Sequence, residues 1–153
     1  MRALRPPRKL SRMLWKTCGA FSRTQRRAIR LHESKVRAVV LAGGEARIRL
    51  SAYVEVSNGE PGNAAGTAWE QELELVVGGA ALEGPAPAGA LWVSGGHVAV
   101  GSEEHELLAL PLEAEGAVRV ALSGAEGRLR LTGTSIHSEE LAEPRFLERL
   151  QPS

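Results

Sequence analysis

The sequence predicts an all-β fold, an antiparallel β-sandwich or partly open barrel of seven or eight strands with a short C-terminal helix. Apolar residues occupy every second position from 46 to 56, which is typical of a strand with one buried side and one solvent-exposed side. Glycine pairs at 43–44, 78–79 and 95–96 supply the positive φ angles of tight turns. The stretches between these turns are too short for the crossovers of a parallel sheet.

The first predicted hairpin covers residues 35–56. Segment 35–41 alternates like segment 46–56, and Gly43-Gly44 lies between them. The polar side of the longer strand carries Arg47, Arg49, Ser51, Tyr53 and Glu55. Residues 57–67, rich in Gly and Asn, predict a loop that follows this strand.

Later segments predict shorter strands. Segment 68–77 alternates apolar residues with glutamates, and Gln71 interrupts its apolar row. A loop at 83–89 follows. Segments 91–93 and 98–100 flank Gly95-Gly96 and predict a second hairpin.

The last part of the chain predicts one more hairpin and the helix. Residues 103–106 are polar and predict a turn. Segment 108–112 contains a proline, which cannot donate to a ladder, and predicts an edge strand. Segments 118–122 and 129–133 predict the third hairpin. Segment 144–150 begins with proline and predicts a helix whose apolar residues face the body.

Charge divides the chain into two parts. Residues 1–30 carry ten Arg or Lys and no acid, whereas residues 31–153 carry the remaining nine bases and all 18 acids. We therefore expect a basic extension over 1–30, disordered or loosely helical, and a single antiparallel β domain over 31–153.

The basic extension has two further interpretations. A segment rich in Arg and Ser without acids is typical of an organelle transit peptide. It is also suited to attach to nucleic acid or to an anionic membrane. Without a transit peptide, we expect a cytoplasmic protein, because the lone Cys18 cannot form an internal disulfide and no apolar run is long enough to span a membrane.

The composition argues against most enzyme classes. Every acidic residue is Glu, so sites that require Asp, such as Ser-His-Asp triads and EF-hand loops, are excluded. The glycine pairs lack the helix and the Lys-Ser/Thr of a phosphate loop. We expect a non-enzymatic module with no catalytic residue and no cofactor.

A metal site is the alternative for an enzyme or metal-dependent protein. His32 and Glu33 precede the first strand, and His137 follows the last. Two imidazoles and one carboxylate suit zinc or another divalent ion if these strand ends meet.

The expected binding surface combines the loop after the longest strand with the acidic side of the next one. Such a surface attracts a basic protein partner over a long range and loses that attraction in salt. Its expected members are Tyr53, Asn58, Asn63, Glu70, Glu72 and Glu74.

One segment of the chain resembles the start of known proteins. It consists of residues 31–41, LHESKVRAVVL, and the predicted hairpin that follows them. This start resembles the Leu-His-Asp/Glu opening of small β-rich bacterial proteins of unknown function, some of them grouped with immunity proteins of polymorphic toxin systems. The resemblance covers residues 31 to about 56. It implies a cytoplasmic bacterial protein that binds another macromolecule, and it leaves the oligomeric state open.

Overall fold

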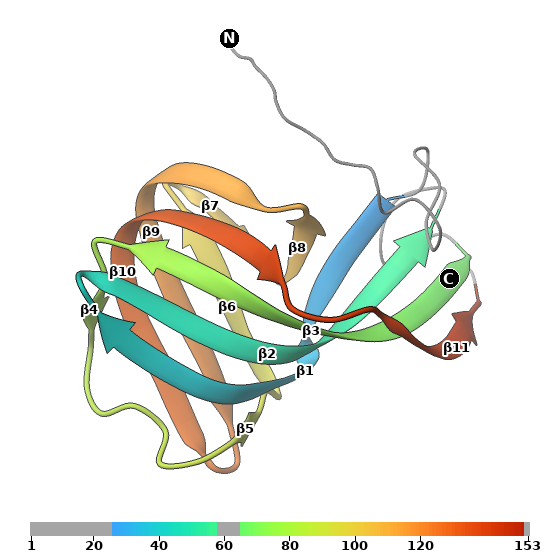
Figure 1. Ribbon diagram of the computed structural model, residues 1–153, viewed down its shortest axis with the longest axis horizontal. Coiled ribbons are helices and arrows are strands. Elements are labelled where there is room, and N and C mark those ends of the chain that lie inside the picture. Colours follow the sequence, from blue (N-terminus) through green and yellow to red (C-terminus); the bar gives the residue numbers. More distant parts are fainter. Residues whose placement is uncertain (1–25, 58–64, 152–153) are drawn as a thin grey trace, which may run out of the picture.

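The computed structural model describes residues 26–57 and 65–151, which form one antiparallel sheet of eleven strands without any helix (Figure 1). The all-β antiparallel prediction is confirmed, although the strands outnumber the expected seven or eight. The strands are β1 (Arg26–Ala42), β2 (Glu45–Ser57), β3 (Gly66–Gly78), β4 (Ala81–Leu82), β5 (Leu91–Trp92), β6 (Gly95–Val100), β7 (Glu103–His105), β8 (Leu107–Leu110), β9 (Glu113–Gly124), β10 (Gly127–Glu140) and β11 (Arg145–Leu150).

The sheet curls into an open half-barrel with the strand order β5-β1-β2-β3-β10-β9-β6-β7. Strands β1 to β3 lie across the core from β6, β9 and β10 (Figure 1). The short strands β8, β4 and β11 pair with β1, β10 and β3. The link between β5 and β6 joins the two sides, because the amide of Val93 donates to Ser34 O (3.0 Å) and that of Ser94 to Ser123 O (2.8 Å).

The period-two pattern of β2 gives the core its inner wall, as predicted. The apolar residues of this strand all face inward and are at most 2% exposed, because they meet the inward residues of the opposite strands. The outer side of β2 carries Arg47, Arg49, Ser51, Tyr53 and Glu55. The largest fully buried apolar side chains of the sheet are Ile29, Leu31, Ile48, Leu50, Leu73, Leu75, Leu91, Leu122, Leu129, Leu131 and Ile136.

Two of the three predicted hairpins are confirmed. Strands β1 and β2 pair up to Ala42 and Glu45, and Gly43 and Gly44 make the turn with φ angles of 64° and 79°. Strands β9 and β10 likewise pair from Gly124 and Gly127 onward. The first strand begins at Arg26, so residues 26–30 belong to the sheet and not to the basic extension, where the charge pattern placed them.

The predicted hairpin around Gly95-Gly96 is wrong. Strand β5 pairs with β1, whereas β6 pairs with β9 and β7, so the two glycines lie inside β6. Their function is close approach: a Cβ on Gly96 would lie 2.1 Å from the carbonyl oxygen of Ala121 in β9. The predicted turn at 103–106 also differs, because residues 103–105 form the short edge strand β7.

The predicted C-terminal helix is wrong as well. Residues 145–150 form β11, which pairs with residues 66–70 of β3 beyond the part of β3 that β10 covers. Phe146 packs against Trp69 edge to face, with ring centroids 5.4 Å apart. Pairing with an open strand edge therefore outweighs the local helical pattern.

Gln71, which interrupts the apolar row of β3, is 1% exposed. Its side-chain amide donates to Glu140 Oε1 and to the carbonyl of Ala142, both at 3.1 Å. These bonds hold the segment between β10 and β11 against β3. The interruption thus marks the place where the chain changes from one strand partner to the next.

Candidate functional site

The residues predicted for binding lie on the outer side of β2 and β3 as far as the structure describes them. Tyr53 pairs with Glu70, and Glu72 and Glu74 follow on the same side of β3. Asn58 and Asn63 lie outside the described residues. The structure therefore places four of the six predicted residues on one surface.

The three glutamates of that surface have partners within the chain. Glu70 forms an ion pair with Arg145, and Glu72 accepts a hydrogen bond from Ser51. The carboxylate of Glu74 lies 3.0 Å from Arg47 and 3.8 Å from Arg49. The surface thus carries alternating charges of both signs instead of an unopposed acidic patch.

The same network extends onto β10. Glu139 lies 2.8 Å from His137 Nε2 and 3.1 Å from Arg47. The hydrogen bond with His137 and the one from Arg47 hold the pKa of Glu139 below its usual value. Ionised carboxylates on this side are therefore tied to cations across three strands.

Tyr53 is held in place by β11. Its hydroxyl donates to Glu148 Oε2 at 2.8 Å, and its backbone amide donates to Ser34 Oγ at 3.0 Å. Burial, together with the hydrogen bond to Glu148, raises the pKa of Tyr53 well above its usual value. The neutral phenol is the form that this surface stabilises.

The high pKa of Tyr53 predicts a loss of stability in alkali. Tyr53 is the chain's single tyrosine, so absorbance at 295 nm follows its ionisation alone. In the unfolded chain the phenol of Tyr53 ionises near pH 10, whereas in the folded chain it keeps its proton to higher pH. Stability from this source is complete below about pH 10 and is lost as the pH rises further. Glu148→Gln should bring the folded titration closer to that of the chain in urea, and coincident titrations of folded and unfolded wild type would contradict the prediction.

The residues of the predicted metal site do not come together. His32 and Glu33 are exposed in an irregular stretch of β1, where its register against β2 shifts. His137 lies three strands away in β10, opposite Val76 of β3. Across residues 26–57 and 65–151, no three His, Cys, Asp or Glu side chains are grouped to hold a metal ion.

The sequence did not reveal a different group, formed by three arginines on the outer side of β9 and β10. Arg119 lies opposite Thr132, two positions along β10 from Arg130, and Arg128 is two positions further. Strand geometry places neighbours of this kind about 7 Å apart. Alternation with buried Leu129 and Leu131 already indicated that Arg128 and Arg130 face outward, but no sequence signal indicates which arginines lack partners.

These three arginines, which we call the arginine patch, form no ion pair with any carboxylate in the part of the chain that the structure describes. By contrast, carboxylates bind Arg27, Arg30, Arg47, Arg49 and Arg145. Three neighbouring cations without partners repel one another, so the patch gives the folded chain no stability of its own. A guanidinium in this state is available for bidentate contact with a carboxylate or phosphate.

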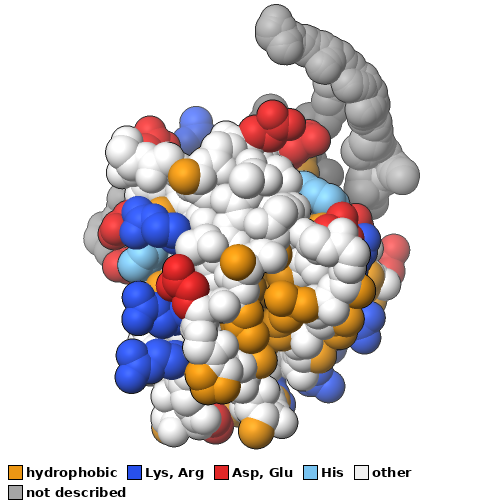
Figure 2. Space-filling model, turned by 90° about the vertical axis from the view of Figure 1, so that its left-hand side faces the viewer, with side chains coloured by type: hydrophobic (Ala, Val, Ile, Leu, Met, Phe, Trp, Pro, Cys, Tyr) orange, Lys and Arg blue, Asp and Glu red, His pale blue; other side chains and the backbone are white. Residues whose placement is uncertain are grey.

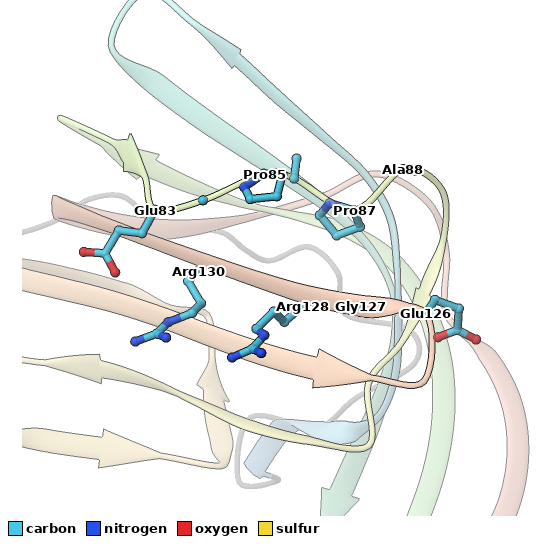
Figure 3. A pocket seen from close by; sticks show the side chains of 10 residues that line it. Glu83, Pro85, Pro87, Ala88, Glu126, Gly127, Arg128 and Arg130 are labelled. Carbon is cyan, nitrogen blue, oxygen red and sulfur yellow. The ribbon is translucent and has the colours of Figure 1, made fainter.

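A depression of about 460 Å³ adjoins the patch. Arg128, Arg130 and the turn before them line one side, and residues 83–88 line the other (Figure 3). Pro85 and Pro87 make that second side largely apolar. Glu126 belongs to the lining too, but its carboxylate accepts a hydrogen bond from the amide of Trp92 at 3.1 Å. Figure 2 shows Lys and Arg side chains in a column beside a concentration of hydrophobic ones.

A second depression, also of about 460 Å³, lies at β6 and β7. His97 and His105 line it together with two glutamates and Leu107. His97 lies 3.9 Å from Glu104, and His105 lies 3.6 Å from Glu103. These contacts are typical of exposed charged side chains at a protein surface. They do not form the catalytic arrangement in which a base activates a nucleophile and a third group orients the base.

Comparisons of the chain with protein-family models, curated proteins and solved structures find no match. The described residues also contain no helix with the length and apolar character needed to cross a membrane.

Proposed function

We propose that this chain is a non-enzymatic interaction module that binds an acidic segment of another protein through the arginine patch. The observation that carries the proposal is that Arg119, Arg128 and Arg130 are neighbours on the outer side of β9 and β10 and have no carboxylate partner among the described residues. By contrast, Arg47, Arg49 and Arg145 each lie beside a glutamate of a neighbouring strand. Arginine is enriched at protein interfaces, whereas lysine is depleted there. The resemblance of residues 31–56 to immunity-like bacterial proteins also implies a macromolecular partner.

The expected charge of the partner is therefore negative instead of positive. The sequence pointed to a basic partner for Glu70, Glu72 and Glu74, but arginine or serine side chains already bind these glutamates. The free charge of the outer surface is instead positive at the patch. An acidic segment would approach it under electrostatic attraction and would form charge-assisted hydrogen bonds on contact.

The test uses a fluorescent peptide of alternating Glu and Val, blocked at both ends, and measures anisotropy with the full-length protein at low and moderate salt. The triple variant Arg119→Gln, Arg128→Gln, Arg130→Gln should bind at least about tenfold more weakly, which corresponds to about 0.5 kcal/mol per charge. Glu83→Gln, which removes a carboxylate that lines the same depression, should bind more tightly. Higher salt should weaken wild-type binding more than that of the triple variant.

A matched control separates the patch from net charge. The variant Arg2→Gln, Arg5→Gln, Arg8→Gln removes the same three charges from the basic extension. It should bind the peptide nearly as the wild type does. Equal losses in the two triple variants would overturn the proposal, and so would a patch variant that loses affinity for single-stranded DNA but not for the acidic peptide.

A further inference from the structure

One edge of β10 is open beside the depression. Strand β4 pairs with residues 131–132 of β10, and the amide of Glu83 continues this ladder by donating to Arg130 O at 2.8 Å. The ladder then stops, because Gly84 has a φ of 81° and turns the chain away. Pro85 and Pro87 follow, and neither has an N–H to donate.

The open edge presents the backbone of Arg128. In a strand, the N–H and C=O of residues two apart point to the same side, so those of Arg128 point with those of Arg130 toward β4 and the loop. Strand β9 occupies the opposite edge of β10, and the backbone N–H and C=O of Leu129 face it. No backbone bond from loop 84–88 to Arg128 occurs among the described residues. The donor and acceptor of Arg128 therefore face the depression between β10 and the loop.

We infer that the acidic segment binds as an added β-strand along residues 127–129 of β10, beneath loop 83–88. This inference rests on the proposed function and adds the geometry of recognition. Strand addition satisfies the unpaired backbone groups of an edge and reads alternate side chains of the ligand. The ligand residue opposite Arg128 points its side chain to the outer side of the sheet, beside Arg128 and diagonal to Arg130, which favours a carboxylate at that position.

The loop defines how long the added strand is. Residues 127–129 span about 10 Å of strand, which is room for about three ligand residues. At one end Glu83 closes the site by its bond to Arg130, and at the other the β9–β10 turn closes it. Pro85 and Pro87 form an apolar wall and have no N–H that could compete with the ligand for the backbone hydrogen bonds of Arg128. A short extended segment fits this edge, whereas a helix would leave the backbone of Arg128 without a partner.

The experiment compares the alternating peptide with two N-methylated forms, one methylated at the Glu amides and one at the Val amides. Only one set of amides faces β10 in an added strand. We expect one methylated form to bind at least about tenfold more weakly and the other to stay within about threefold of the parent. Equal behaviour of the two forms would overturn strand addition while leaving the proposed function intact. No binding by the parent peptide would overturn both.

Amide hydrogen exchange supplies a second measurement on the full-length protein. Saturation with the parent peptide should slow exchange at the Arg128 amide and leave the Leu129 amide unchanged, because the latter already faces β9. Unchanged exchange at Arg128 under saturation would contradict the inference. The variant Arg128→Gln keeps the backbone, so it should weaken the peptide without abolishing the residual protection at position 128.

Discussion

Gly96→Ala should lower the free energy of unfolding by about 3 kcal/mol or more, the largest effect that we expect from a single methyl group in this chain. The φ angle of Gly96 is 133°, which side chains of L-residues rarely adopt. Its Cβ would also lie 2.1 Å from Ala121 O and 2.8 Å from Leu122 Cα, both in the backbone of β9. Relief of this contact requires β6 and β9 to separate, which breaks their ladder.

Urea denaturation followed by tryptophan fluorescence measures this loss, and Gly101→Ala is the control. Gly101 also has a positive φ, 62°, but nothing lies within 4 Å of its Cβ position. Its substitution should cost about 1 to 2 kcal/mol from backbone conformation alone. Similar losses at the two glycines would mean that β6 does not approach β9 as closely as the structure has it.

Arg30→Met should lower the free energy of unfolding by about 3 kcal/mol, the second largest expected effect. Arg30 forms an ion pair with Glu55, whose side chain is only 2% exposed. Methionine keeps the aliphatic stem and removes the charge, so the buried carboxylate loses the guanidinium of this ion pair. The cost of such a change is mainly the desolvation of the remaining charge.

The double variant Arg30→Met, Glu55→Gln distinguishes this mechanism from lost packing. It should recover at least about 1 kcal/mol, since the amide carries no charge that needs compensation. Arg37→Met on the same strand is the control, because Arg37 is exposed and its guanidinium contacts an uncharged group, Ser51 Oγ, at 3.4 Å. A double variant less stable than Arg30→Met would contradict the charge argument.

The long strands could be predicted because burial of one side gives them an alternating pattern of apolar residues. The alternation of residues 46–56 appears in the structure as the inner wall of β2, because each inward residue meets the core. Gly43-Gly44 form the expected turn, because the two strands they join are adjacent and antiparallel. Here local sequence and tertiary structure agree, which is the condition for a prediction from pattern alone.

The errors arose where a distant strand decides the conformation. Gly95-Gly96 has the composition of a turn, but the sequence holds no sign that Ala121 lies against Gly96. Residues 145–150 have a helical pattern, yet β3 offers them an open edge and Trp69 offers a ring for Phe146. Both decisions depend on contacts between segments far apart in the chain.

The candidate site was only partly predictable for the same reason. Strand periodicity placed Tyr53 and the glutamates of β3 on the outer side correctly, and Arg128 and Arg130 follow from the same rule. Which charges remain unpaired depends on strand order, which brings Arg47 beside Glu74 and leaves Arg119 beside Thr132. Charge counts along the sequence do not contain that information.

The division of β1 has a consequence for synthesis on the ribosome. Residues 27–30 of β1 pair with β8, and residues 35–36 pair with β5, so the outer edge of the first hairpin is completed by residues made much later. A lone two-stranded ribbon is marginally stable in water. Until residue 110 has emerged, the nascent hairpin has an uncovered edge beside its still exposed apolar side, and a chaperone that shields extended apolar segments would find its best target there.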